Sequence, residues 1–272
     1  PAIVAARLAD VRRYEPRLER EIGENTVHDM RVAIRRLRAA LKLFGGRGSQ
    51  PLQQEVKRLQ DALGEVRDVH VQMSWMHREL AARGAPGELA RVCEAQRRRL
   101  PALEARLRAE LRRWQKRVVP KVLAHVESLE LEGPLGGNAV RKALKRQLRR
   151  IEKRIVRLLD DQDPDGERAH QLRIKLKKLR YQAELVRPAF PRRVDVVLDT
   201  LVPFQQLLGE LHDVQVRAEL LRRTVGSRGR SAQVKALLTR VEEAQLQLAA
   251  ESSAELDRWQ KARVAKALRR TL

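Results

Sequence analysis

The residues from Val27 to Leu41 read VHDMRVAIRRLRAAL, and the interpretation of the whole chain starts from this stretch. Hydrophobic residues recur in it at steps of three and four, a spacing that places them on one face of an α-helix. Continued by three residues, this apolar stripe consists of Val27, Met30, Ile34, Leu37, Leu41 and Phe44. The pattern predicts a helix over residues 26–44 whose apolar stripe faces a helical core.

A row of nitrogen donors runs beside this stripe, displaced by one residue. This first cationic row consists of His28, Arg31, Arg35, Arg38 and Lys42. It spans about 21 Å, because its ends lie 14 residues apart at about 1.5 Å per residue. Like charges at this spacing repel one another by a few tenths of a kcal/mol per pair, yet no acidic residue occurs between Asp29 and Glu55. We interpret the row as a surface that binds an anion.

Nearly the same stretch occurs again as AHQLRIKLKKLRYQA, from Ala169 to Ala183. The second cationic row consists of His170, Arg173, Lys177 and Arg180, and it ends at Glu184. Two further segments recur in the same order: LGEVRDVHV at 63–71 returns as LGELHDVQV at 208–216, and RWQK at 113–116 returns at 258–261. The sequence therefore predicts an internal duplication into two halves, residues 1–133 and 137–272.

The composition predicts an all-α fold, because helix formers dominate and β-branched or aromatic runs of strand length are missing. The predicted helices are 2–22, 26–44, 51–82 and 87–130 in the first half, and 138–160, 165–187, 192–224 and 231–271 in the second. Four amphipathic helices with short loops predict an antiparallel four-helix bundle in each half. Pro101 and Pro120 predict a kink or break in the fourth helix of the first half. Trp114 and Trp259 are expected to anchor the packing of the fourth helices, with their indole N–H groups satisfied at a surface.

The charge balance indicates a polyanionic partner. The chain has 58 Lys and Arg residues against 35 Asp and Glu, which gives a net charge of +23, and such an excess destabilises a compact chain unless an anion is bound. Nucleic acid, an anionic membrane surface and polyphosphate all qualify. No stretch approaches 18 consecutive apolar residues, so we expect no membrane insertion. Cys93 is the only cysteine, which excludes an internal disulfide framework and fits a reducing cytoplasm.

The repeated third-helix motif pairs two carboxylates at a spacing of three residues in each half. These acids are Glu65 and Asp68, then Glu210 and Asp213. Such pairs could hold a metal or act as acid and base, but no arrangement of Ser, Cys or His nucleophiles accompanies them. We interpret them as buried or half-buried partners that orient the arginines of the second helix, with Gly64 and Gly209 marking close helix approaches.

The two row histidines also have a simple interpretation. No second His or Cys follows His28 or His170 at the three- or four-residue spacing of a helical metal pair, so we expect no metal and no cofactor. As first-turn residues, both can donate an N–H to an anion that also meets the helix N-terminus. This role agrees with the arginines that follow them.

Together the segments HDMRVAIRRLR, LGEVRDVHV, HQLRIKLKKLRY and LGELHDVQV resemble the CHAD family, the conserved-histidine α-helical domain. The resemblance covers essentially the whole chain. It implies two four-helix bundles related by a pseudo-two-fold axis, which bind inorganic polyphosphate through a basic surface or central groove without catalysis. Both cationic rows would then face the ligand. Two positions depart from the repeat, since His212 stands where Arg67 does and Glu184 replaces the last cation.

Other functions remain open from the sequence. A nucleic-acid-binding protein is disfavoured by an aromatic content of 3% and by the lack of a helix-turn-helix or zinc-finger signature, although we expect non-specific binding to nucleic acid at low salt. A polyphosphate or triphosphate hydrolase would use the four paired acids with a divalent metal. We expect a non-catalytic polyphosphate-binding protein, targeted to polyphosphate granules in the cytoplasm, where a scaffolding role is compatible with binding.

Overall fold

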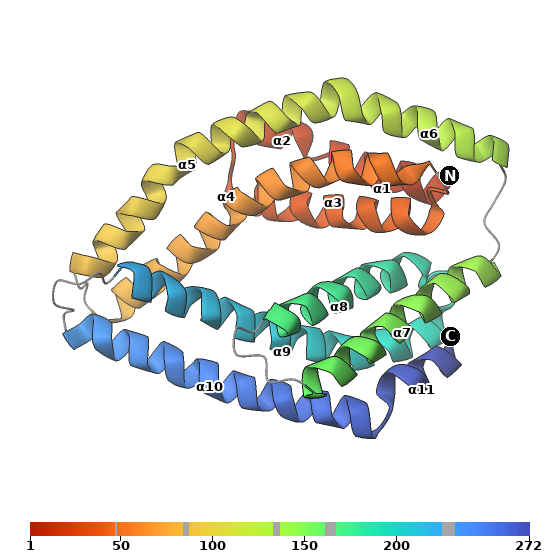
Figure 1. Cartoon of the computed structure of the whole chain (residues 1–272). Helices are drawn as coiled ribbons and strands as arrows, with labels where there is room; N and C mark the ends of the chain where they lie inside the picture. The colour runs from red at the N-terminus through yellow and green to blue at the C-terminus, as the bar shows by residue number, and fades with distance from the viewer. Residues whose placement is uncertain (47, 84–86, 133–136, 161–166, 225–231) are drawn as a thin grey trace. The chain divides into compact units, whose positions relative to one another are not determined.

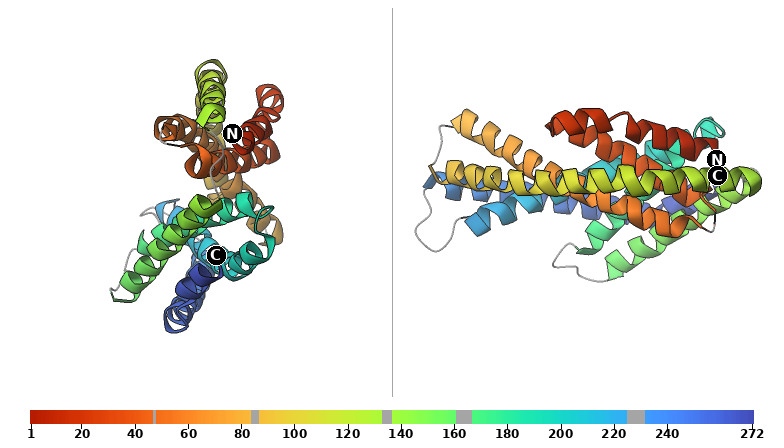
Figure 2. Two further views of the ribbon diagram at one scale, coloured as in Figure 1. Left: turned by 90° about the vertical axis from the view of Figure 1, so that its right-hand side faces the viewer. Right: turned by 90° about the horizontal axis from the view of Figure 1, so that it is seen from above.

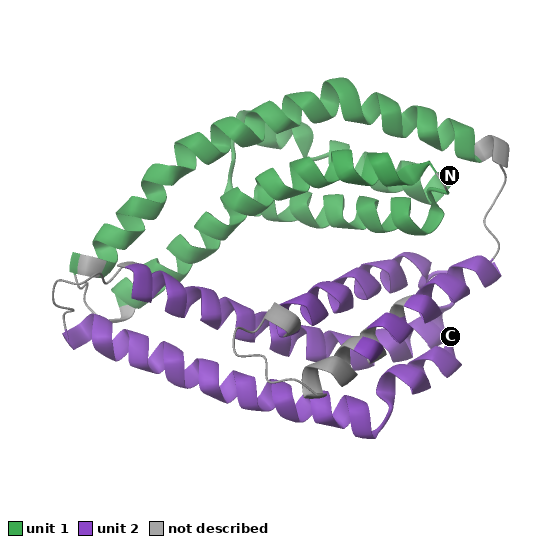
Figure 3. Ribbon diagram, viewed as in Figure 1, with its two compact units in different colours: residues 1–135 green, residues 136–272 purple. Residues whose placement is uncertain are grey.

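A computed structural model of the chain describes residues 1–46, 48–83, 87–132, 137–160, 167–224 and 232–272. Every regular element in these ranges is helical, as the all-α prediction requires. The chain divides into two compact units, Pro1–Leu135 and Gly136–Leu272, which Figure 3 draws in separate colours. No helix among the described residues has the length and apolarity needed to cross a membrane.

Unit 1 is a four-helix bundle in which helices that follow one another in the chain are neighbours in space (Figure 1). Its elements are α1 (Ala2–Arg12), α2 (Glu15–Arg20), α3 (Glu24–Phe44), α4 (Ser49–Arg83), α5 (Gly87–Arg113), the π-helical segment η1 (Trp114–Val118) and α6 (Val119–Glu132). α3 packs against α1 and α4, α4 packs against α5, and α6 returns to α1 and closes the bundle.

Unit 2 repeats this order of packing. Its elements are α7 (Gly137–Asp160), α8 (Glu167–Val186), α9 (Pro191–Thr224), α10 (Ala232–Lys261) and α11 (Val264–Thr271). α8 packs between α7 and α9, α10 packs against α9 and α7, and α11 contacts α7 and α9. The helix that carries the cationic row thus lies between two others in each unit: α3 between α1 and α4, and α8 between α7 and α9.

Two helices that the sequence predicts as continuous are divided. The predicted helix over 2–22 ends at Arg12 and resumes as α2, because the ring of Pro16 would clash with the carbonyl four residues earlier in an unbroken helix. The predicted helix over 231–271 breaks at Arg263, which adopts the left-handed conformation with φ 49° and ψ 40°. Burial of Ala265, Leu268 and Leu272 beyond the break offsets the cost of that conformation.

The two prolines of the fourth helix, where the sequence predicts a kink or a break, differ in their effect on the helix. α5 continues through Pro101 as an α-helix. Just before Pro120, by contrast, the chain forms the five-residue π-helical segment η1, which widens the helix by one residue where the proline ring meets the preceding turn. The segments α5, η1 and α6 follow one another along the bundle, as Figure 2 shows from two further directions.

The two tryptophans of the fourth helices anchor the cores as predicted, with exposed fractions of 1% for Trp114 and 2% for Trp259. The indole of Trp114 donates to Glu15 Oε1 at 2.8 Å, and Glu15 is itself buried, so this bond lies inside the unit and not at a surface. Trp259 donates to Glu255 Oε1 at 2.9 Å and packs on Phe204 with ring centroids 5.1 Å apart. Each unit therefore has its own aromatic anchor.

Candidate anion-binding site

The first cationic row lies along the boundary between the core of unit 1 and solvent. Five of the six stripe residues of α3 are fully buried: Val27, Met30, Ile34, Leu37 and Leu41. One residue further round the helix, Arg31, Arg35 and Arg38 are half-buried, while His28 and Lys42 are exposed. The Nε atoms of Arg31 and Arg38 are buried, whereas each residue as a whole remains partly exposed.

Arg31 lies against the third helix of its unit. A Cβ atom placed on Gly64 would lie 3.7 Å from Arg31 Nη2, so the guanidinium group covers this glycine. Arg31 Nη1 is 3.9 Å from Asp68 Oδ1, a long ion pair whose acid side chain is 66% exposed. The atoms nearest to Gly64 are thus those of the Arg31 side chain at ordinary contact distance, and the close helix approach predicted at this glycine is not observed. At Gly209 the same prediction is wrong, since a Cβ there would meet nothing within 4 Å.

An arginine–glutamine pair recurs at corresponding positions of the two units. Arg38 Nη1 donates to Gln60 Oε1 at 2.8 Å, and Arg180 Nη1 donates to Gln205 Oε1 at 3.4 Å. A neutral amide positions a guanidinium group without cancelling its charge. Both glutamines lie three residues before the LGE segments of the repeat, so the repeat in the sequence extends to this pair of glutamines.

The four paired acids fit only in part the role that the sequence suggested. Glu65 accepts two hydrogen bonds, at 2.9 and 2.8 Å, from Arg106 of α5 instead of orienting an arginine of α3. Asp68, Glu210 and Asp213 are exposed and not half-buried. The predicted burial is therefore wrong for these three, because the positions fall on the solvent side of the third helices, but Asp68 does pair with Arg31 of α3, as predicted.

Near the start of the first cationic row, Arg67 of α4 is held by an acid. Its Nη1 donates to Glu24 Oε1 at 2.6 Å, and Ser74 donates to Glu24 Oε2 at 3.1 Å. Although His28 as a whole is exposed, neighbouring atoms exclude water from part of its ring, and this desolvation, followed by the charges of Arg67 and Arg35, lowers the pKa of His28. An anion bound beside His28 would therefore lie near Arg67 as well as near the first cationic row. In the sequence, the only signal at Arg67 is its replacement by His212 in the repeat.

At the corresponding place in unit 2, two histidines meet. His170 Nδ1 and His212 Nδ1 are 3.4 Å apart, and Arg173 Nη2 is 3.4 Å from His170 Nδ1. Because a guanidinium group only donates, this contact requires an unprotonated Nδ1, which puts the proton of a neutral His170 on Nε2. Burial, and then the charges of Arg173, His170 and Lys177, lower the pKa of His212 to about 4. His212 is therefore neutral at pH 7, whereas Arg67, the corresponding residue of unit 1, is positively charged.

The second cationic row has less net positive charge at its C-terminal end than the first. Arg180 Nε donates to Glu184 Oε1 at 2.7 Å, so a carboxylate neutralises this arginine one turn before the helix ends. In unit 1 the residue that corresponds to Glu184 is Lys42, which is exposed. The two rows thus begin alike and end with opposite charges. Among the residues that the structure describes, no three His, Cys, Asp or Glu side chains lie together as a metal site would need.

The pKa of His212 leads to a stability prediction. Between about pH 6.5 and pH 4 the unfolded chain binds a proton at this residue that the folded protein does not, so the free energy of unfolding falls as the pH falls through this window. We expect wild type to lose about 1–2 kcal/mol more than His212→Gln between about pH 7 and pH 4.5, measured by urea denaturation. Other titrating groups are common to both proteins and cancel, and equal losses would contradict the assignment.

Comparison with known proteins identifies the family. The model of the CHAD domain matches residues 2–222. The chain is similar to the crystal structure of the CHAD domain from the plant Ricinus communis, at 25% identity and a TM-score of 0.68, over 100% of this chain and 90% of that chain. It is also similar in fold to PptA from Streptomyces chartreusis, at 17% identity and a TM-score of 0.61, over 96% of each chain. A search of curated proteins gives no match.

The matched residues take in almost all of unit 1 and, in unit 2, α7, α8 and most of α9. Both cationic rows and the third-helix segments that contact them fall inside this range. From the family match, which covers well over half of the chain, and from the agreement of fold over its full length, we conclude that this chain belongs to the CHAD domain family.

Proposed function

We propose that this protein binds inorganic polyphosphate without hydrolysing it, through the first and second cationic rows. The observation that carries the proposal is the state of Arg31 and Arg38, which are half-buried, partly accessible to solvent and held by contacts that do not neutralise them closely. Arg38 is held by the neutral Gln60, and Arg31 lies over Gly64 with only a long contact to an exposed acid. A flexible polyanion can pair its oxygens with such groups and release counterions as it binds.

Polyphosphate suits these rows better than a nucleic acid does. It has no bases to stack and no groove to read, and a plain row of donors is sufficient for it. The three tryptophans, which would be the strongest stacking groups, are all buried: Trp75, Trp114 and Trp259 are 5%, 1% and 2% exposed. Membership of the CHAD family supports the same ligand, because the resemblance of the motifs implies polyphosphate. Targeting to polyphosphate granules is the cellular role that we propose for this binding.

A competition experiment tests this choice of ligand. Labelled long-chain polyphosphate is bound to the protein at about 0.15 M salt and displaced by unlabelled polyphosphate, duplex DNA or single-stranded RNA. We expect polyphosphate to displace the label at a phosphate concentration at least about tenfold lower than either nucleic acid, because the rows offer no base contacts. Equal displacement by all three would show that net charge alone determines binding.

Catalysis is tested separately. Glu65, the acid that a hydrolase would need beside a metal, is engaged by two hydrogen bonds from Arg106, which disfavours metal binding there. We expect no release of orthophosphate when the protein is incubated with polyphosphate and Mg²⁺ or Mn²⁺. Steady release that Glu65→Gln abolishes would make the protein an enzyme and overturn the non-catalytic proposal.

A further inference from the structure

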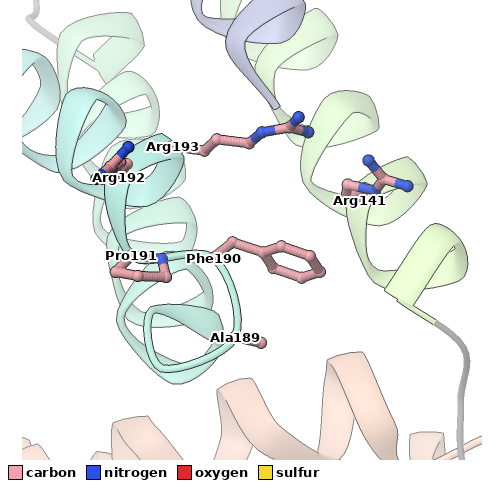
Figure 4. Close-up of a pocket in the computed structure, with 6 residues that line it drawn as sticks. All are labelled: Arg141, Ala189, Phe190, Pro191, Arg192 and Arg193. Carbon is pink, nitrogen blue, oxygen red and sulfur yellow. The ribbon is translucent and has the colours of Figure 1, made fainter.

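Unit 2 contains a cavity of about 420 Å³ that belongs to neither cationic row. It lies where the turn after α8 leads into α9, beside the first turns of α7. Its lining residues are Arg141, Ala189, Phe190, Pro191, Arg192 and Arg193 (Figure 4). The volume is in the range of small-molecule sites. Ala189, Pro191, Arg192 and Arg193 are exposed, so the cavity is open to a ligand from solvent.

The lining is half cationic and half apolar. Figure 4 shows the side chain of Phe190, from the turn before α9, and that of Arg193, from the first turn of α9, both extending toward α7, which carries Arg141. The guanidinium carbon of Arg141 is 5.9 Å from the centroid of the Phe190 ring. Arg141 also donates to the side-chain amide oxygen of Asn138, a neutral partner that leaves its charge available. A ligand that satisfies this lining must carry both negative charge and a flat apolar group.

The position of the aromatic ring is specific to this unit. A Cβ atom on Gly137 would lie 3.2 Å from Phe190 Cζ, so the absence of a side chain at the start of α7 leaves room for the ring. When the repeat is aligned on His28 and His170, the residue that corresponds to Phe190 is Gly48. The first half therefore has no aromatic residue at the position that corresponds to Phe190.

We propose that this cavity binds a nucleoside phosphate, with the base against the ring of Phe190 and the phosphates at Arg141 and Arg193. Base–aromatic stacking and pairing of arginine with phosphate oxygens are the two contacts that such a lining offers. Inorganic polyphosphate would satisfy the arginines but leave Phe190 and Pro191 uncovered. The site uses no residue of either cationic row, so it does not depend on the proposed polyphosphate binding.

The test uses isothermal titration of the whole chain at about 0.15 M salt with ATP, tripolyphosphate and adenosine. Charge reversal in the rows, by Arg31→Glu with Arg173→Glu, first removes binding of phosphates there. In this background we expect ATP to bind at least about tenfold more tightly than either tripolyphosphate or adenosine. Equal binding of ATP and tripolyphosphate, or no binding of ATP, would overturn the proposal. Neither result bears on polyphosphate binding by the unaltered rows, so the two proposals fail separately.

Substitutions then locate the site. Phe190→Leu is expected to weaken ATP about tenfold while leaving tripolyphosphate unchanged, because it removes the stacking surface and keeps an apolar side chain. Gly137→Ala, which would displace the ring and not remove it, should weaken ATP in the same direction. The matched control is Arg187→Gln, an arginine of the same turn that pairs with Asp195 at 2.7 Å and does not line the cavity. If Phe190→Leu and Arg187→Gln bind ATP equally well, the cavity is not the nucleotide site.

Discussion

Reversing one charge in each cationic row, by Arg31→Glu with Arg173→Glu, is expected to weaken polyphosphate binding by about 100-fold or more, equivalent to about 2.7 kcal/mol. Both arginines are half-buried beside the core, at matching places of their rows. Each substitution removes a donor and places a carboxylate where a phosphate oxygen would bind. Because both rows belong to one chain, a polymer held by one row is at high effective concentration for the other, and losing both contacts costs more than losing either.

The control for this prediction changes net charge by the same amount elsewhere. Arg97→Glu with Arg98→Glu alters two exposed arginines of α5, outside both rows. We expect less than about a threefold effect on affinity at about 0.15 M salt, where distant surface charges are largely screened. Affinity is measured by fluorescence anisotropy of end-labelled polyphosphate, with circular dichroism to show that all variants fold. If the two double variants behave alike, binding reflects net charge and the rows have no special part in it.

Truncating the buried tryptophan of unit 1, by Trp114→Ala, is expected to lower the free energy of unfolding by about 3–5 kcal/mol. The side chain is 1% exposed and its indole N–H bonds the buried Glu15, so truncation leaves a cavity and removes a donor from a buried carboxylate. Trp114→Phe keeps most of the packing, and Gln115 still donates to Glu15 at 3.2 Å, so a loss of only about 1–2 kcal/mol is expected.

The effect should be confined to one unit. Amide hydrogen exchange, read separately for residues of α1 to α6 and of α7 to α11, should accelerate in unit 1 alone for Trp114→Ala. Trp259→Ala is the matched control and should accelerate exchange in unit 2. Equal acceleration in both units for either variant would contradict separate cores, and unchanged exchange would contradict the role of the tryptophan as an anchor.

The helices and the rows could be predicted from sequence because their pattern is local and repeated. Spacing of three and four residues places Leu37 in the core and Arg38 beside it, whatever surrounds the helix. The break at Arg263 could not be predicted in this way, because no proline or glycine marks it and it depends on the packing of α11 against α7 and α9. The break before α2 could have been predicted from Pro16, because a proline disrupts the helical turn that precedes it. The helical spacing of the apolar residues on both sides led instead to the prediction of one continuous helix.

Partners across helices were harder to predict than faces along one helix. Glu65 was expected to pair with an arginine of α3, but it pairs with Arg106 of α5. Which neighbouring helix such an acid contacts depends on the rotation of its own helix within the bundle. The exposure of Asp213 follows from the same rotation. His170 and His212 lie on two different helices and 42 residues apart in the sequence. The sequence indicated this contact only through the presence of His212 at the position that corresponds to Arg67.

The way the row arginines are held has a consequence for the entropy of binding. Arg31 is packed over Gly64, and Arg38 and Arg180 are tied to Gln60 and Gln205. Fixing a long side chain at an interface costs about 0.5–1.5 kcal/mol when it happens on association, but here much of that rotamer freedom is already lost when the protein folds. For the polyphosphate ligand proposed above, the ordering that remains at binding is chiefly that of the polymer. Arg→Lys exchanges in the rows would keep the charge and lose this advantage, because a flexible ammonium group forms no such packed contacts.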